Sequence, residues 1–83
     1  MDYRLLIDLD TVVALDSQSK RQRLKLLSFF EQIREYPERC SFATERDDRG
    51  QLIHVASHAG WLIYYWADFA DRHVKILKIR RVI

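Results

Sequence analysis

The pattern of apolar and polar residues predicts an amphipathic helix in the first half of the chain. Between residues 20 and 35 the apolar positions recur about every three residues and form one stripe: Leu24, Leu26, Leu27, Phe29, Phe30 and Ile33. Polar side chains occupy the opposite face, as in a helix that packs on a core. Ser17 or Ser19 can cap the first turn. The helix should run to about Glu35, because Pro37 disfavours helical geometry at the residue before it.

A short strand and a brief helix are predicted before this long helix. The segment from Tyr3 to Asp8 carries apolar residues at alternate positions, which indicates a strand. Asp8 or Asp10 can then cap a helix from Thr11 to Leu15, because a short carboxylate side chain satisfies the free N–H groups of a first turn.

The period changes to that of β-strands in the second half of the chain. The predicted strands are Leu52 to Ser57, Trp61 to Ala67, and His73 to about Arg81. Turns separate them at Ser57 to Gly60 and at Asp68 to Arg72. A further candidate strand, Ser41 to Glu45, precedes the turn Asp47 to Gly50. The dense aromatic and aliphatic content of Trp61 to Ala67 predicts a central strand that is buried on both faces.

These elements predict an α+β fold in a single domain that covers residues 1–83. The order is β-α-α-β-β-β, and the two helices should pack on one face of a small antiparallel sheet. No further element remains to cover the other face. Large exposed apolar patches are uncommon on monomers. We therefore expect the uncovered face to bind a partner, or a second copy of the chain in a homo-oligomer.

The composition fits a globular protein that is expected to lie in the cytoplasm. The chain has 83 residues, of which 48% are hydrophobic and 31% are charged. Its apolar runs are shorter than the roughly 18 residues that a membrane span requires, and its first residues lack the pattern of a secretory signal. Cys40 is the single cysteine and is expected to act as a small buried apolar residue.

Basic residues gather in the last predicted strand, where acidic residues are absent. They are Lys75, Lys78, Arg80 and Arg81. Simple alternation along a strand places Lys78 and Arg80 on one face and the other two on the opposite face, so at least one pair should reach the uncovered face. Basic residues beside aromatic rings suit single-stranded nucleic acid, because rings stack on bases and cations hold phosphates. They suit equally a hydrophobic protein interface, or a charged edge that prevents aggregation.

The sequence contains no motif for a cofactor or a metal ion. His54, His58 and His73 lack the spacing of a metal-binding set. Gly50 and Gly60 are the only glycines, which excludes a glycine-rich phosphate loop. We therefore expect neither a cofactor nor a metal. His54 is a candidate general base, because histidine titrates closest to neutral pH.

Two segments resemble the RelE/ParE superfamily of bacterial toxin–antitoxin proteins. The first begins at Trp61-Leu62-Ile63-Tyr64 and continues to Asp68, so that apolar residues and tyrosine precede an acidic turn. The second is the rhythm Val-x-Ile-Leu-x-Ile from Val74 to Ile79, followed by basic residues. The order of elements agrees over nearly the whole chain. In this superfamily, RelE-type members cleave messenger RNA on the ribosome and ParE-type members act on DNA gyrase. An antitoxin neutralises both types.

The resemblance implies site residues, and the sequence departs from several of them. RelE-like enzymes carry an arginine where Trp61 falls and another near His54. They also carry a His-Arg pair and a terminal tyrosine after the last strand, a region that reads Arg80-Arg81-Val82-Ile83 here. The candidate catalytic residues that remain are His54, Arg80 and Arg81, and Trp61 is expected to have become a core residue.

The function that the resemblance implies is a toxin-like component that inhibits translation by cleaving or blocking messenger RNA at the ribosome. Its nucleic-acid-binding residues would be Lys75, Lys78, Arg80 and Arg81. The alternative is a non-enzymatic binder, either a ParE-type gyrase inhibitor or a decayed toxin that only binds proteins. The missing arginine and tyrosine favour this alternative, whereas the basic strand favours nucleic acid. An antitoxin is the expected protein partner, and no membrane association is expected.

Overall fold

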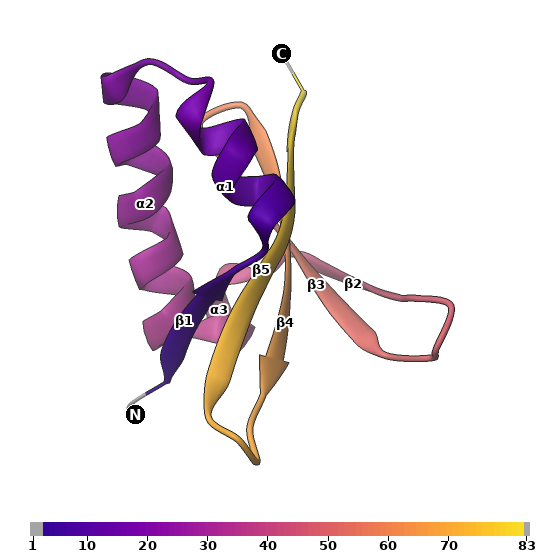
Figure 1. Cartoon of the computed structure of the whole chain (residues 1–83). Coiled ribbons are helices and arrows are strands. Elements are labelled where there is room, and N and C mark those ends of the chain that lie inside the picture. The colour runs from indigo at the N-terminus through magenta and orange to yellow at the C-terminus, as the bar shows by residue number, and fades with distance from the viewer. Residues whose placement is uncertain (1–2, 83) are drawn as a thin grey trace.

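The computed structural model describes residues 3–82, which form three helices and five strands (Figure 1). In chain order the elements are β1 (Arg4–Ile7), α1 (Leu9–Asp16), α2 (Lys20–Glu35), α3 (Pro37–Cys40), β2 (Ala43–Arg46), β3 (Leu52–His58), β4 (Trp61–Asp68) and β5 (His73–Arg81). The predicted succession of a strand, helices and a meander is confirmed, and the candidate strand Ser41 to Glu45 corresponds to β2. The first two residues and the last residue of the chain lie outside the described part.

The five strands form one sheet with the order β1-β5-β4-β3-β2. The strands from β2 to β5 follow one another as an antiparallel meander, as predicted. β1 pairs in parallel with the other edge of β5, with Arg4 opposite His73, so the sheet as a whole is mixed. A parallel pair requires a long connection between its strands. The helices and the three intervening strands supply that connection.

The long helix α2 forms as its sequence pattern predicts. The hydroxyl oxygen of Ser19 caps it by accepting a hydrogen bond of 3.2 Å from the backbone N–H of Gln22. The helix ends at Glu35, before Pro37. Its buried residues are Leu26, Phe29, Phe30 and Ile33. Leu24 belongs to the predicted apolar stripe but is 56% exposed, so the stripe that faces the core is narrower than predicted.

The two short helices differ from the prediction. α1 extends beyond the predicted range of Thr11 to Leu15 at both ends, and Asp8 occupies its N-cap position without a side-chain hydrogen bond. The sequence pattern does not predict α3. Pro37 is the first residue of α3, a position where the missing N–H of proline has no consequence for helix hydrogen bonding. The same proline therefore ends α2 and begins α3.

The helices cover one face of the sheet and enclose the core between helix and strand (Figure 1). The buried apolar residues of this core are Tyr3, Leu15, Leu26, Phe29, Phe30, Ile33, Ala56, Trp61, Ile63, Tyr65, Val74 and Ile76. This arrangement confirms the predicted packing of helices on a single face. Within residues 3–82, no helix has both the length and the apolar character needed to span a bilayer.

Candidate nucleic-acid interface

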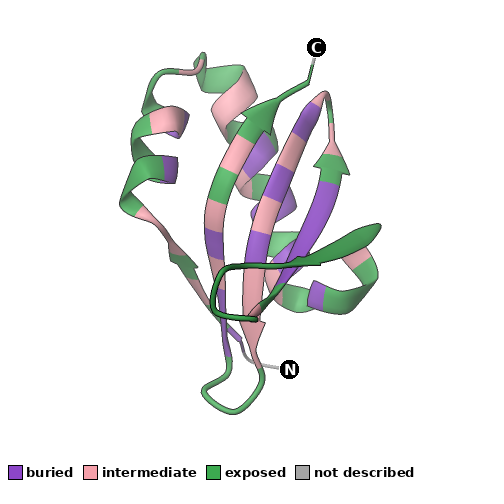
Figure 2. Ribbon diagram, turned by 90° about the vertical axis from the view of Figure 1, so that its right-hand side faces the viewer, coloured by how far each residue is buried: buried purple, intermediate pink, exposed green. Residues whose placement is uncertain are grey.

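The candidate binding surface is the face of the sheet that points away from the helices. Along β4 the two faces alternate: Trp61, Ile63 and Tyr65 are buried, whereas Leu62, Tyr64 and Trp66 are only partly buried. We call the side that carries Leu62, Tyr64 and Trp66 the open face, and Figure 2 views the sheet from that side. The predicted burial of this strand is therefore complete on the helix side and partial on the other.

A β-bulge in β5 determines which basic residues reach the open face. Tyr64 pairs with Lys78, but the next residue of β4, Tyr65, pairs with Ile76. Leu77 is thus an extra residue in β5 without an opposite partner in β4. Because side chains alternate with a period of two, one extra residue exchanges the faces of all residues on one side of it relative to those on the other.

Three basic residues share the open face as a result. The cross-strand pairs on this face are Trp66 with Lys75, Tyr64 with Lys78, and Leu62 with Arg80. Directly paired residues lie on the same side of a sheet. Arg81 pairs with Trp61 and therefore lies on the helix side. The prediction that Lys75 points away from Lys78 and Arg80 is wrong, because counting along the sequence does not allow for the bulge.

The aromatic and basic side chains of the open face are close to one another. The Nζ atom of Lys78 lies 4.5 Å from the ring centroid of Tyr64, which is a cation–π contact. The Trp66 ring meets the His73 ring edge-on, with centroids 5.3 Å apart. Lys75, Lys78 and Arg80 form no ion pair with another described residue. Their charges are therefore available to an anionic ligand.

The hairpin of β2 and β3 bounds this surface on one side. It leaves the plane of the sheet and projects on the side of the open face (Figures 1 and 2). Val55 pairs with Tyr64 and so belongs to the open face, yet Val55 and Ile53 are each only 6% exposed. The prediction that nothing covers this face holds for β4 and β5 but not for β3. The accessible area is a strip along the two strands that carry the rings and cations.

His54, the candidate general base, lies on the helix side. It pairs with Tyr65, its ring stacks on the Tyr65 ring with centroids 5.2 Å apart, and its Nδ1 is 3.2 Å from the Ser41 hydroxyl oxygen. Burial lowers the pKa of His54, although the carboxylate of Glu38 opposes this shift. Only 7% of its surface is exposed. The structure thus separates His54 from Arg80, which lies across the sheet.

The partner of His54, Tyr65, is held by the turn between α2 and α3. Its hydroxyl donates a hydrogen bond to the backbone carbonyl of Pro37. Burial raises the pKa of the Tyr65 hydroxyl well above its ordinary value, so the group stays protonated and remains a donor. This contact links α3 to the centre of the sheet, and it gives His54 and Tyr65 a structural role.

Trp61 is a core residue, as predicted. It is 4% exposed, and the Arg81 guanidinium lies 5.4 Å from its ring centroid. Its neighbour on β3, His58, stacks on Phe29 of α2 with ring centroids 4.3 Å apart. The Arg81–Trp61 contact and the His58–Phe29 stack therefore cover the helix-side core at this end of the sheet. Of the predicted basic residues, Arg81 is the one that the open face does not include.

Sequence reasoning did not single out Tyr64 and Trp66 as surface residues. The dense aromatic and aliphatic content of Trp61 to Ala67 predicted burial of both faces of this strand instead. The signal that separates them was present in the alternation of Trp61 to Ala67, since positions 62, 64 and 66 must share one face. Which of the two faces the helices cover cannot be read from that alternation, because both carry large apolar side chains.

The turn between β4 and β5 gathers the groups that come closest to a metal-binding set. Single ligand atoms of Asp68, Asp71 and His73 lie within 4.8 Å of one another. Asp68 already accepts hydrogen bonds of 3.0 Å from the backbone N–H groups of Ala70 and Asp71. Asp71 contacts His73 at 2.9 Å and Arg4 at 3.2 Å. These contacts account for the cluster as the internal bonding of a turn.

No protein-family model and no curated protein matches the chain. Solved structures do match. A chain of the archaeal RelE–RelB complex from Pyrococcus horikoshii aligns with 25% identity and a TM-score of 0.79, covering 98% of this chain and 96% of that one. A chain of the RelBE2 toxin–antitoxin complex from Mycobacterium tuberculosis has 16% identity and a TM-score of 0.84, covering 98% and 99%. A chain of the intact E. coli RelBE toxin–antitoxin complex has 14% identity and a TM-score of 0.75, covering 99% of both. The chain has a RelE/ParE-like toxin fold, which confirms the resemblance seen in the sequence.

Proposed function

We propose that this chain is the toxin of a toxin–antitoxin pair and inhibits translation by binding messenger RNA at the ribosome through its open face. The observation that carries the proposal is the row of three cross-strand pairs, each of which joins a basic residue to an aromatic or apolar one. The similar solved structures are RelE–RelB and RelBE complexes, which supports an antitoxin as the protein partner.

The chemistry of the open face suits a single strand of nucleic acid better than a duplex. Tyr64 and Trp66 are flat rings on which unpaired bases can stack, and such stacking contributes about 1–3 kcal/mol per base. Lys75, Lys78 and Arg80 lie in the same rows and can bind the phosphates between those bases. In a duplex the faces of the bases are stacked on one another, so they are not free to stack on these rings.

We propose further that the chain blocks the RNA rather than cleaves it. Histidine is the most common general base for removing the proton of a 2′-hydroxyl, and it must lie within hydrogen-bond reach of that group. His54 is buried across the sheet, and His58 is on the helix side as well. Of the histidines in the described chain, only His73 shares the open face, where it is 9% exposed and contacts Asp71. The open face therefore provides cations and rings without an accessible histidine.

Induced expression of the chain in a bacterial host should slow growth, and incorporation of labelled methionine into protein should fall before DNA synthesis does. Co-expression of the gene adjacent to that of the chain, as the candidate antitoxin, should restore growth. A primary fall in DNA synthesis with DNA breaks would instead support gyrase as the target. Harmless expression of folded protein would refute the toxin proposal and leave a protein-binding module.

Replacing Lys75, Lys78 and Arg80 together with glutamine should weaken binding to a single-stranded RNA oligonucleotide. Three lost phosphate contacts should reduce the slope of log affinity against log salt concentration by about 2, since each contact on a single strand contributes about 0.7. The free energy of unfolding should change little, because exposed charges contribute little to folding. Fluorescence anisotropy at several salt concentrations measures the slope.

The matched control for this experiment is Arg81→Gln. It removes a positive charge from the same strand, next to Arg80, but on the helix side. Its effect on the salt slope should be clearly smaller than that of Arg80→Gln. Equal effects of the two single variants would contradict the assignment of the RNA-binding surface to the open face.

A further inference from the structure

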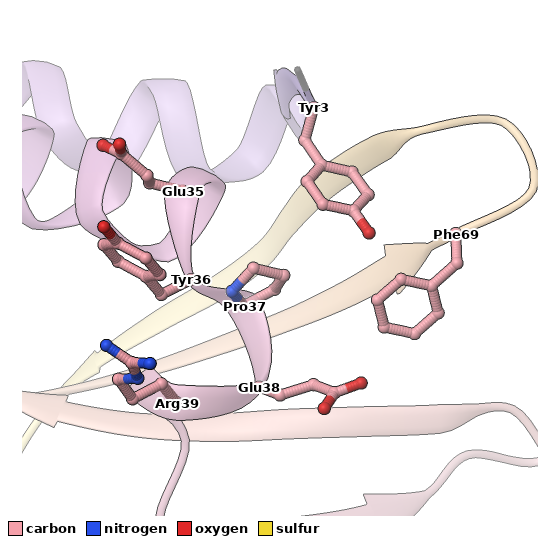
Figure 3. Close-up of a pocket in the computed structure, with 7 residues that line it drawn as sticks. All are labelled: Tyr3, Glu35, Tyr36, Pro37, Glu38, Arg39 and Phe69. Atoms are coloured by element: carbon pink, nitrogen blue, oxygen red, sulfur yellow. The ribbon is translucent and has the colours of Figure 1, made fainter. Parts of the chain in front are cut away.

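A second surface lies on the helix side of the sheet, at the end away from Trp61 and Arg81. There the turn between α2 and α3 meets β1 and the β4–β5 turn. A groove of about 680 Å³ opens there (Figure 3). Its lining residues are Tyr3, Glu35, Tyr36, Pro37, Glu38, Arg39 and Phe69. None of them belongs to the rows of rings and cations on the open face, so the groove is a separate feature of the molecule.

Aromatic rings and a proline form the apolar part of the groove lining. Tyr3 is 5% exposed and Pro37 is buried, whereas Phe69 at the rim is 50% exposed. The Tyr3 and Phe69 rings meet edge-on, with centroids 6.0 Å apart. The Tyr3 hydroxyl points into the space between Pro37 and Phe69 and has no hydrogen-bond partner among the described residues (Figure 3). The groove thus offers apolar surface together with one available polar group at its base.

The charge at the rim of the groove is negative. The side chains of Glu35 and Glu38 lie on opposite sides of Pro37 (Figure 3), and neither carboxylate forms an ion pair within residues 3–82. Two guanidinium groups are nearby, but neither pairs with these carboxylates. The Arg39 guanidinium lies over the Tyr36 ring at 4.9 Å, and the Arg34 guanidinium pairs with Glu31 and donates a hydrogen bond to the backbone carbonyl of Tyr3. Two unpaired carboxylates beside an apolar groove contrast with a chain whose formal net charge is +2.

We propose that this groove docks a short segment of a partner protein in which an apolar side chain is flanked by lysine or arginine. The apolar side chain would fill the space over Tyr3 and Pro37 and cover the exposed ring of Phe69. Its basic neighbours would pair with Glu35 and Glu38, and the Tyr3 hydroxyl would bond to the backbone of the segment. An acidic segment is disfavoured, because its charges would face two carboxylates.

The test uses two synthetic peptides, acetyl-Gly-Lys-Leu-Lys-Gly-amide and its counterpart with glutamate in place of lysine. Each is titrated into the ¹⁵N-labelled full chain, and amide chemical shifts are followed by NMR. The lysine peptide should shift the amides of Tyr3, Tyr36, Glu38 and Phe69. Its dissociation constant should be about fivefold lower than that of the glutamate peptide, since ion pairs at an exposed surface contribute only weakly to binding.

Two variants and one control make the result decisive. Glu35→Gln together with Glu38→Gln should abolish the preference for the lysine peptide, and Phe69→Ala should weaken binding of both peptides. Glu45→Gln, which removes an exposed carboxylate from β2, should leave the preference intact. Equal affinity for both peptides, no shifts with either, or shifts confined to the open face would overturn the proposal. Binding of single-stranded RNA by the Glu35→Gln, Glu38→Gln protein should be unchanged, so the outcome is independent of the proposed toxin function.

Discussion

Replacing Trp61 with alanine should lower the free energy of unfolding by about 3–5 kcal/mol. The side chain is 4% exposed and packs in the helix-side core, so its removal leaves a cavity that the surrounding residues fill only in part. Chemical denaturation followed by circular dichroism measures the change. Small domains of this size have modest stability, so a substantial unfolded fraction at 37 °C is expected.

Trp61→Phe is the control that isolates packing from hydrogen bonding. The indole N–H of Trp61 is buried without a hydrogen-bond partner in the described chain, so removing it costs no hydrogen bond. Phenylalanine keeps most of the apolar volume, and its cost should therefore be much smaller than that of alanine. A stable Trp61→Ala protein that has lost RNA affinity would show instead that the ring is a ligand contact.

Replacing Trp66 with alanine should weaken RNA binding and have a smaller effect on folding stability, the reverse of what is expected for Trp61→Ala. Trp66 is on the same strand but on the open face, opposite Lys75, and it is only partly buried. If its ring stacks on a base, binding of a single-stranded RNA oligonucleotide should weaken by about 1–3 kcal/mol, which is about 5- to 150-fold. The loss of folding stability should be smaller than for Trp61→Ala, because less apolar surface is removed from the core.

The two tryptophan variants therefore form a matched pair. They make the same chemical change on one strand and differ in the face of the sheet. RNA binding that is unaffected by Trp66→Ala would refute a stacking surface on β4 and would favour the phosphate contacts alone as the source of affinity.

The sequence was sufficient to predict the helices and strands in which a regular apolar pattern extends over several turns or residues. The stripe of α2 and the strands β3, β4 and β5 were predicted to within one or two residues. The helix α3 was not, because four residues are too few to show a helical period and a proline is most often interpreted as the end of a helix. Trp61 was correctly assigned to the core, because the dense apolar content of its strand favoured burial.

The candidate site was harder to predict than the fold, because it depends on pairing between strands. All of its basic residues are visible in the sequence, but the bulge at Leu77 determines which of them share a face. A bulge leaves no reliable trace in apolar alternation when both faces of a strand carry large apolar residues. The parallel pairing of β1 with β5 likewise depends on tertiary contacts, and no local pattern in Arg4–Ile7 predicts it.

The pairing of β1 with β5 affects the order in which the parts of the sheet form during synthesis and folding. Arg4 pairs with His73, so most of the described chain separates the two strands. Contacts of this kind form late in folding, because the entropy of closing a long loop is lost before the contact stabilises anything. The cations of the open face also lie on β5, so they are synthesised after nearly all other elements. During its own synthesis the nascent chain therefore lacks both a finished sheet and the surface that we propose binds RNA. Under the proposed function, the chain can act on translation only after its own synthesis has passed β5.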